Sequence, residues 1–182
     1  MKFYDFTIAT TEDIESIVEI EKKYFEKSVA YTSEFIRKWI DYNPNMFYVV
    51  KDRNNNIKAF TILVPITEVC FNKLSRNEIN DMNQFEKSDV LQTVQSEFYY
   101  FADIATFNKD PLSTVSLLNG IQKYLCNYAH YVAATPITDD GLRISKIFGF
   151  GPILERGKNC FVEITPEIKE KYQDGFEKRK KR

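Results

Sequence analysis

The 182-residue sequence has few of the residues that build metal sites or disulfide frameworks. It contains three cysteines and a single histidine, His130. The cysteines, Cys70, Cys126 and Cys160, are widely spaced and show no zinc-ligand pattern, so reduced thiols are expected. No apolar stretch reaches the about 18 residues of a membrane-spanning helix, and the first residues lack a signal-peptide core. These absences predict a cytoplasmic protein with no metal and no membrane partner.

Excess charge of one sign is also missing. The formal net charge is −1, so no global field recruits nucleic acid or anionic lipid. The one concentrated basic stretch is Lys178–Arg182, which is typical of a solvated terminal tail. Nucleic acid is therefore not an expected partner, and a homodimer is left open.

The first third of the chain alternates between strand and helix patterns. Residues 3–8 read as a strand, and Thr10 with Asp13 forms a capping-box start to a helix. A second helix is expected from Ser33 and ends before Asn43-Pro44. Residues 46–51 and 57–66, joined by a polar turn, predict a β-hairpin.

The rest of the chain continues this alternation after an interruption. Residues 67–96 have helical pieces and a charged middle, which predicts a solvent-facing insert. Residues 97–107 form the most strand-like stretch, and Asp110-Pro111 opens a helix. Its expected buried seam is Leu117, Leu118, Ile121, Tyr124, Leu125 and Tyr128.

Beyond that seam, residues 131–135 form a strand, and Asp139 or Asp140 caps a helix that ends at Phe148-Gly149. Two last strands, 150–154 and 159–164, follow. We therefore expect an α/β fold: a mixed, mostly antiparallel sheet with one parallel crossover and helices on both faces. The predicted organisation is one domain over residues 1–165, with the insert at 67–96, and a charged C-terminal tail at 166–182. Within this tail, the residues after about Tyr172 are expected to be dispensable for folding.

Three stretches carry a resemblance to a known family. They are the entry to the first helix at 8–14, the strand Ala102-Asp103-Ile104-Ala105-Thr106, and the helix with a Gly-Phe ending at 141–150. Together with the order of elements, they resemble the GNAT superfamily of N-acetyltransferases over nearly the whole chain to residue 164. The resemblance implies a GNAT-like sheet, acetyl-CoA as co-substrate and acyl transfer to an amine.

The phosphate-binding motif of that family, Q/R-x-x-G-x-G/A, is degenerate in this chain. The matching positions hold Lys109, Leu112 and Thr114, and no register restores the glycines. Side chains restrict close approach of a pyrophosphate to the backbone, and Asp110 adds a carboxylate there. Two interpretations stay open: an ordinary capped helix, or a modified phosphate site that uses Lys109, Ser113 and Thr114. The second implies weak acetyl-CoA binding.

The resemblance also suggests catalytic residues. Asp103 and Glu97 lie on the central strand, where family members often place a carboxylate, so either is a candidate general base. Ser145 matches the position of a tyrosine that protonates the departing thiolate in many members, although a serine hydroxyl is a poor acid. A strand bulge at Ile104, Ala105 and Thr106 would hold the pantetheine arm and polarise the thioester carbonyl.

The resulting expectation is an acyl-CoA-dependent N-acyltransferase that transfers acetyl to a primary amine of a small molecule or peptide. The alternative is a non-catalytic GNAT-like binding or regulatory module, in which the lost glycines reflect a lost co-substrate. The strands around Phe101 and Val132 are expected to diverge into a V-shaped cleft. Because long excursions from a rigid scaffold tend to carry function, the insert is expected at the mouth of the acceptor side of this cleft.

Overall fold

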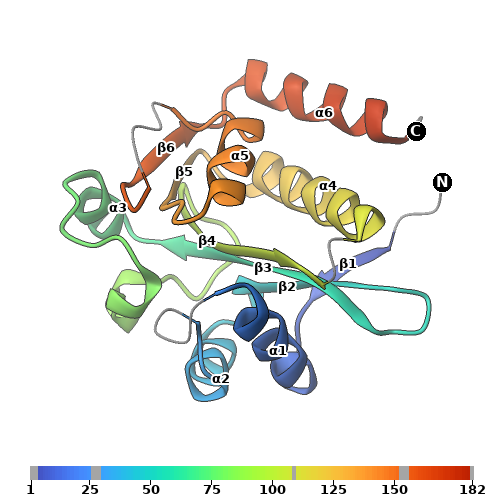
Figure 1. Cartoon of the computed structure of the whole chain (residues 1–182). Helices are drawn as coiled ribbons and strands as arrows, with labels where there is room; N and C mark the ends of the chain where they lie inside the picture. Colours follow the sequence, from blue (N-terminus) through green and yellow to red (C-terminus); the bar gives the residue numbers. More distant parts are fainter. Residues whose placement is uncertain (1–3, 26–29, 108–109, 152–155, 181–182) are drawn as a thin grey trace. The chain divides into compact units, whose positions relative to one another are not determined.

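The computed structural model describes residues 4–25, 30–107, 110–151 and 156–180. Within these residues six strands form one sheet in the order β1-β2-β3-β4-β5-β6, and Figure 1 labels them. The expected mixed α/β fold is therefore confirmed, and β4 lies inside the sheet, as its sequence predicted. None of the described helices is long and apolar enough to cross a membrane.

The chain divides into two compact units. The first consists of residues 1–62 and 103–120, and the second of residues 63–102 and 121–182. The strands β3 and β4 and the helix α4 each contribute residues to both units. Each unit is described by itself below.

The first unit contains an antiparallel set of strands. Strand β1 (Asp5–Ile8) pairs with β2 (Phe47–Lys51), and β2 pairs with β3 (Ile57–Ile66). The polar turn between β2 and β3 places Asn55 at a φ of 63°, a backbone region that asparagine tolerates better than most residues. The expected hairpin is confirmed.

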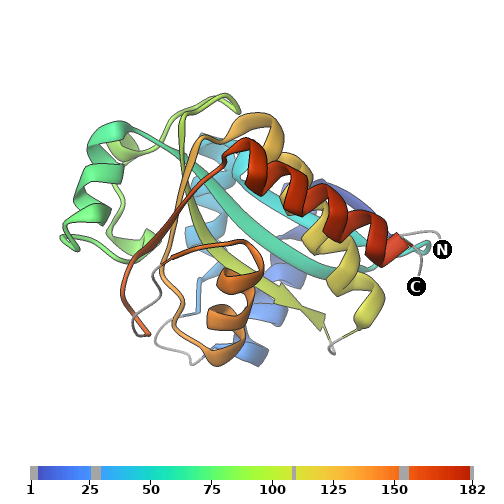
Figure 2. The same cartoon turned by 90° about the horizontal axis from the view of Figure 1, so that it is seen from above.

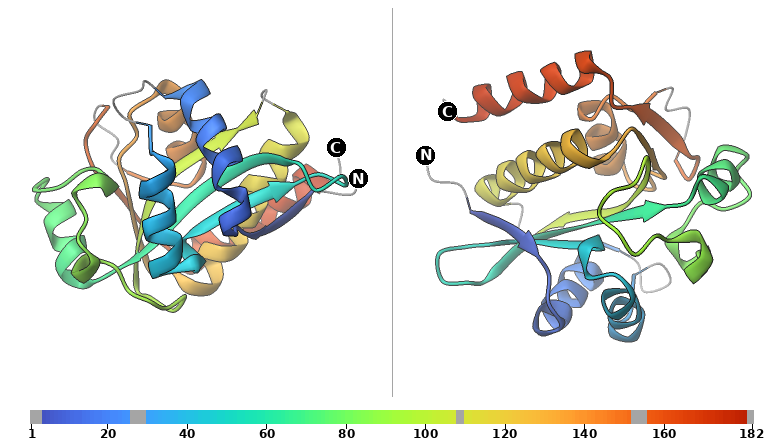
Figure 3. Two further views of the ribbon diagram at one scale, coloured as in Figure 1. Left: turned by 90° about the horizontal axis from the view of Figure 1, so that it is seen from below. Right: turned by 180° about the vertical axis from the view of Figure 1, so that it is seen from behind.

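Helices α1 (Ile14–Tyr24) and α2 (Ser33–Tyr42) follow from amphipathic spacing and local caps. The expected capping box is present, because the Asp13 carboxylate accepts a hydrogen bond from the Thr10 backbone N–H at 2.9 Å. The same carboxylate pairs with the Lys51 ammonium at 2.8 Å, which ties the start of α1 to the end of β2. The right panel of Figure 3 shows both helices on one face of the first-unit strands.

The second unit contains the parallel crossover. Strand β4 (Phe98–Thr106) pairs in parallel with β5 (Tyr131–Ala134), and β5 pairs antiparallel with β6 (Cys160–Glu163). Helix α4 (Pro111–Tyr128) connects β4 to β5. Its buried seam is as expected except for Tyr128, which is 39% exposed because it lies in the last turn of the helix.

The aromatic side chains of β4 alternate between the two faces of the sheet in this unit. Tyr99 packs edge-on against Tyr124 of α4, and Phe101 packs edge-on against Phe148. Phe148 follows helix α5 (Asp139–Ile147), so α4 and α5 cover the same face. Since side chains alternate along a strand, Phe98 and Tyr100 point to the other face.

One local detail of α5 differs from the sequence prediction. The N-cap of α5 is Thr138, whose hydroxyl accepts the Gly141 N–H at 2.9 Å, and not Asp139 or Asp140, which lie in the first turn. Of the strand expected at 150–154, the described residues show a bridge between Gly151 and Phe161, and residues 152–155 lie outside the described residues. Gly149 has the expected left-handed φ, 80°.

The insert at 67–96 begins with helix α3 (Glu68–Ser75) and continues through two short 3-10 turns. Its Phe71 contacts three rings of the sheet: Phe98, Tyr131 and Phe161. Because Phe98 points away from α4 and α5, the insert covers the opposite face of the second unit. Figure 3 shows the green insert beside β5 and β6.

A polar network holds the insert on the sheet. The Asn159 side-chain amide donates to the carbonyls of Leu74 at 2.7 Å and Ile79 at 2.8 Å. Its oxygen accepts from the Thr135 hydroxyl, which in turn accepts from the Tyr100 hydroxyl at 3.0 Å. The network therefore links β4 and the ends of β5 and β6 to the insert.

We expect Asn159→Ala to loosen the insert selectively. The substitution leaves two carbonyls and a hydroxyl without their partner, which costs about 1–3 kcal/mol when such groups stay buried. Hydrogen exchange should show faster exchange in 70–82 than in wild type, while α1 and α2 keep their protection. Asn80→Ala, which removes only a 3.4 Å contact to the Gly157 carbonyl, is the matched control. Equal exchange in both variants would contradict the role of Asn159.

The C-terminal segment forms helix α6 (Pro166–Lys180) and not a frayed tail. Tyr172 is 2% exposed, and its hydroxyl donates to the Phe148 carbonyl at 2.7 Å. Arg179 donates to the Gln122 side chain of α4. Figures 1 and 2 show α6 beside the second half of α4. Residues 166–180 are therefore a helix anchored through Tyr172, whereas the expectation that the residues after about Tyr172 are dispensable for folding stays a prediction.

Candidate functional site

Strand β4 extends beyond the end of its parallel partner, β5. The β4–β5 register ends at Phe101 and Ala134, whereas β4 continues for five residues, Ala102–Thr106. The backbone of these five residues is not paired with β5 in the described register. This part of β4 contains four of the residues that the sequence singled out: Asp103, Ile104, Ala105 and Thr106.

Asp103 lies at the start of this extension and is half-buried. Its carboxylate accepts a hydrogen bond from the backbone N–H of Ile104 at 2.6 Å, and its backbone carbonyl accepts from the buried Thr61 hydroxyl at 2.7 Å. The Thr61 contact fixes the backbone position, since β3 holds that threonine. The carboxylate therefore covers a backbone N–H that would otherwise be available to an oxyanion.

The first turn of α4 follows the strand extension within the same unit. One Asp110 carboxylate oxygen accepts the Leu112 N–H and the other accepts the Ser113 N–H, both at 3.2 Å. Pro111 has no N–H, and the Thr114 N–H donates to the Asp110 carbonyl at 3.0 Å. Asp110 therefore acts as the N-cap of α4, as the first interpretation of this segment proposed.

The two described hydroxyls that were expected to contact phosphate both donate to a backbone carbonyl. Ser113 is wholly buried, and its hydroxyl donates to the Asp110 carbonyl at 2.8 Å. The Thr114 hydroxyl donates to the same carbonyl at 3.0 Å. The third expected phosphate ligand, Lys109, lies outside the described residues. At both described positions of the modified phosphate site, the hydroxyl thus already donates to a carbonyl of the chain itself.

Glu97 directly precedes β4 in the second unit. Its side chain is 57% exposed and lies 3.6 Å from the Nδ1 of His130, whose Nε2 is 3.3 Å from Glu163. Asp103 is six residues further on, which corresponds to about 20 Å of strand length. The two carboxylates proposed as general base therefore do not share a site.

Ser145 occupies a buried position on α5 in the second unit and is 5% exposed. Its side chain is hydrogen-bonded to the thiol of Cys160 on β6. Burial raises the pKa of Cys160 to about 11, and the Ser145 hydrogen bond offsets part of that rise. This hydroxyl is part of the packing between α5 and β6, which the sequence could not show.

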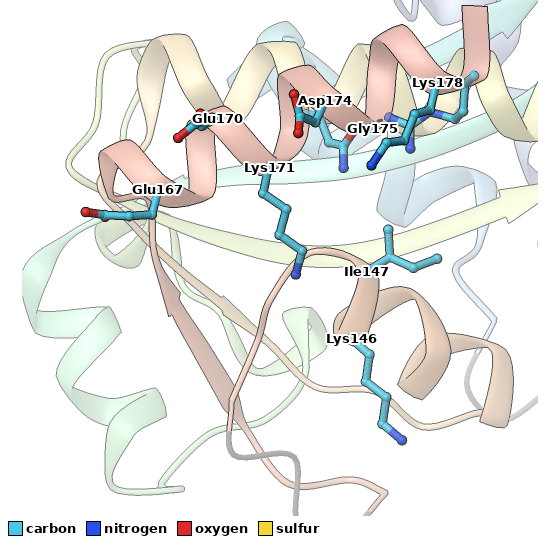
Figure 4. Close-up of a pocket in the computed structure, with 10 residues that line it drawn as sticks. Lys146, Ile147, Glu167, Glu170, Lys171, Asp174, Gly175 and Lys178 are labelled. Atoms are coloured by element: carbon cyan, nitrogen blue, oxygen red, sulfur yellow. Dashed lines mark hydrogen bonds between the residues drawn. The ribbon is translucent and has the colours of Figure 1, made fainter. Parts of the chain in front are cut away.

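A pocket of about 660 Å³ lies among α4, α5 and α6 of the second unit. Four basic and three acidic side chains line it together with Gln122, Ile147 and Gly175; the charged ones are Lys146, Lys171, Lys178, Arg179, Glu167, Glu170 and Asp174. Figure 4 shows Lys171 reaching from α6 toward Ile147. Burial lowers the pKa of Arg179. Sequence reasoning missed this pocket, because it treated α6 as a tail.

A smaller pocket of about 320 Å³ lies in the first unit. Glu12, Asp13 and Glu19 supply carboxylates, and Phe107, which directly follows β4, supplies an aromatic wall. The ammonium of Lys23 lies 4.6 Å from the centre of the Phe107 ring, a cation–π distance. The pocket lining thus combines carboxylates with an aromatic ring, and one of those carboxylates, Asp13, is already paired with Lys51.

Comparisons with known proteins find similarity in structure and not in sequence. No family model and no curated protein matches the chain. Among solved structures, Ard1 from Thermoplasma volcanium matches with a TM-score of 0.58 at 12% identity, over 90% of this chain and 99% of that one. The GphF GNAT-like decarboxylase in complex with isobutyryl-CoA matches with 0.57 at 11%, over 79% and 71%.

The C-terminal condensation domain of Ebony, in complex with beta-alanyl-dopamine, matches with a TM-score of 0.57 at 10% identity, over 90% of this chain and all of that domain. Identities this low establish the fold alone. The chain has the GNAT fold that its order of elements predicted.

Proposed function

We propose that this chain with the GNAT fold transfers an acyl group, most simply acetyl, from acyl-CoA to a primary amine. The observation that carries the proposal is the extension of β4 beyond β5 at Ala102–Thr106. An extended strand edge offers main-chain hydrogen bonds to the amide-containing pantetheine arm without any specific side chain. Support also comes from similar folds solved with isobutyryl-CoA and with beta-alanyl-dopamine.

Asp103 is the proposed general base. In the reaction, the amine nitrogen attacks the thioester carbon, the C–N bond forms and the C–S bond breaks. The proton lost by the amine passes to the Asp103 carboxylate, directly or through water, and the thiolate takes a proton from solvent. As the thioester oxygen gains negative charge, the Ile104 N–H can donate to it once Asp103 turns toward the amine.

The small pocket of the first unit is the proposed acceptor subsite. Its carboxylates, from Glu12 and Glu19, favour an amine that carries positive charge before it reacts, and Phe107 supplies a cation–π surface. Participation of the insert at 67–96 in acceptor binding stays part of the proposal, because long excursions from a rigid scaffold tend to carry function.

A non-catalytic binding module is the second candidate, and a specific observation favours it. The backbone N–H groups of Ile104, Leu112 and Ser113 all donate to aspartate carboxylates of the chain itself. A chain that no longer binds a thioester could keep this arrangement for stability alone. In that case the mixed-charge pocket among α4, α5 and α6 is the proposed ligand site.

The test compares acetyl-CoA with ADP as stabilising ligands. Ligand binding raises the melting temperature by mass action, so 2 mM acetyl-CoA should raise it while 2 mM ADP should not. Release of free thiol in the presence of a panel of primary amines then measures transfer. Absence of both stabilisation and thiol release would remove the enzyme proposal and leave the binding module.

We expect Asp103→Asn to lower kcat/KM for transfer by about 100-fold, within the usual contribution of a general base. The melting temperature should change little, because asparagine keeps an oxygen that accepts the Ile104 N–H. Glu97→Gln tests the competing carboxylate and should lower kcat/KM less than threefold. The assignment of the base passes to Glu97 if that variant shows the larger loss.

A further inference from the structure

Every backbone donor in the first turn of α4 already has a partner within the chain. A helix begins with N–H groups that lack helical partners and commonly bind phosphate. Here Pro111 has no N–H, Leu112 and Ser113 donate to the Asp110 carboxylate, and Thr114 donates to the Asp110 carbonyl. The hydroxyls of Ser113 and Thr114 use that carbonyl as well. A diphosphate at this place would have to displace Asp110.

Electrostatics oppose that displacement. A negatively charged side chain at a helix N-terminus is stabilised by the helix dipole, so Asp110 gains energy where it is. A diphosphate would bring further negative charge next to the carboxylate. In addition, Leu112 presents a side chain where the family pattern has glycine, which limits approach to the backbone.

The conflict at the β4 extension is smaller. The Ile104 N–H already donates to the Asp103 carboxylate at 2.6 Å, but a pantetheine arm brings no negative charge next to that carboxylate. Strand pairing of a pantetheine arm with Ile104–Thr106 uses main-chain groups and no net charge. The chain thus favours binding of the pantetheine half of an acyl-CoA molecule and disfavours binding of its diphosphate-containing half.

We propose that this protein recognises its donor through the pantetheine thioester, and that the ADP half of CoA adds little to binding. The inference rests on the proposed acyl-transfer function. It widens the donor class to any acyl-pantetheine, since phosphopantetheine on a carrier-protein serine has a single phosphate diester and no diphosphate. Free acyl-CoA and an acylated carrier protein are then two sources of the same thioester.

Calorimetry with S-acetyl-pantetheine, S-acetyl-4′-phosphopantetheine and acetyl-CoA tests whether the ADP half of CoA adds to the binding affinity. We expect the three dissociation constants to agree within about threefold. Acetyl-CoA that binds at least 10-fold more tightly than S-acetyl-pantetheine overturns the inference and leaves acyl transfer intact. If none of the three binds at millimolar concentration, the proposed function fails together with the inference.

A purified carrier protein bearing an acetylated phosphopantetheine distinguishes the two sources. Thiol release from the carrier protein, at a rate equal to or above that from acetyl-CoA at the same concentration, assigns the carrier protein as donor. Release from acetyl-CoA alone, with equal small-donor affinities, assigns free CoA and still supports recognition of the pantetheine arm.

Asp110→Asn tests whether the Asp110 carboxylate is the reason that the ADP half of CoA adds little to binding. Asparagine keeps part of the capping and removes the charge, so acetyl-CoA should bind about 5-fold more tightly while S-acetyl-pantetheine binds as before. Asp41→Asn, on the exposed face of α2, removes the same charge away from α4 and should leave the ratio unchanged. If the ratio of the dissociation constants for acetyl-CoA and S-acetyl-pantetheine is unchanged in Asp110→Asn, the Asp110 carboxylate is not what weakens binding of the ADP half. A purely structural role for Asp110 would lower the melting temperature and leave the ratio as in wild type.

Discussion

Replacing Tyr172 with alanine is expected to destabilise the protein by about 3–5 kcal/mol, the range for removing a large buried aromatic side chain. Tyr172 is 2% exposed, packs edge-on against Phe148 with ring centres 5.6 Å apart, and donates its hydroxyl to the Phe148 carbonyl. That carbonyl belongs to the end of α5, where helical carbonyls lack partners. Urea denaturation followed by circular dichroism measures the loss.

Tyr172→Phe is the matched control. It keeps the ring contact with Phe148 and removes only the hydroxyl, so it should cost about 1–2 kcal/mol. Truncation after Thr165, which removes α6 altogether, should cost at least as much as Tyr172→Ala. If truncation leaves the free energy of unfolding unchanged, α6 does not contribute to the folded unit.

The second large effect is expected at Gly120 in α4. A Cβ built at this position would lie 2.3 Å from the Cγ of Phe6 and 2.4 Å from its Cδ2. The Phe6 ring cannot retreat freely, because its other face stacks on Tyr48 at 5.1 Å. Gly120→Ala should therefore destabilise the protein by about 2 kcal/mol through overpacking, although alanine is favoured over glycine in a helix by about 1 kcal/mol.

Gly175→Ala supplies the control for that prediction. It also lies inside a helix, α6, but its added Cβ would meet only the flexible end of Arg179, at 3.2 Å. This variant should be neutral or slightly stabilising. In a Phe6→Ala background, Gly120→Ala should lose its penalty, since the clashing ring is gone. A penalty that persists in the double variant would show that Phe6 is not its cause.

Much of the fold could be predicted because its signals are local. The capping box at Thr10 and Asp13, the hairpin of β2 and β3, and the start of α4 at Asp110-Pro111 each depend on residues within one turn or one strand pair. The parallel arrangement of β4 and β5 followed from the helix that joins them. These predictions were confirmed.

Helix α6 was missed because its apolar signal is thin. Ile168, Tyr172 and Phe176 recur every four residues, which places them on one helical face. Charged neighbours and Gly175 hid that spacing and made the segment read as a tail. A search for i, i+4 spacing, without regard to mean polarity, could have found it.

The candidate site divides in the same way between local and distant causes. The sequence by itself determined the order of elements, the missing glycines and the presence of Asp110 before Pro111, since all of these are properties of neighbouring residues. Only the tertiary structure decided which polar groups already have hydrogen-bond partners within the chain. Ser145 is hydrogen-bonded to Cys160, and Thr61 of β3 fixes the Asp103 backbone. Tyr172 likewise completes the end of α5. Hydrogen bonds and packing between residues far apart in the chain leave no periodic trace in either segment, so burial and partnership became visible only once the chain was folded.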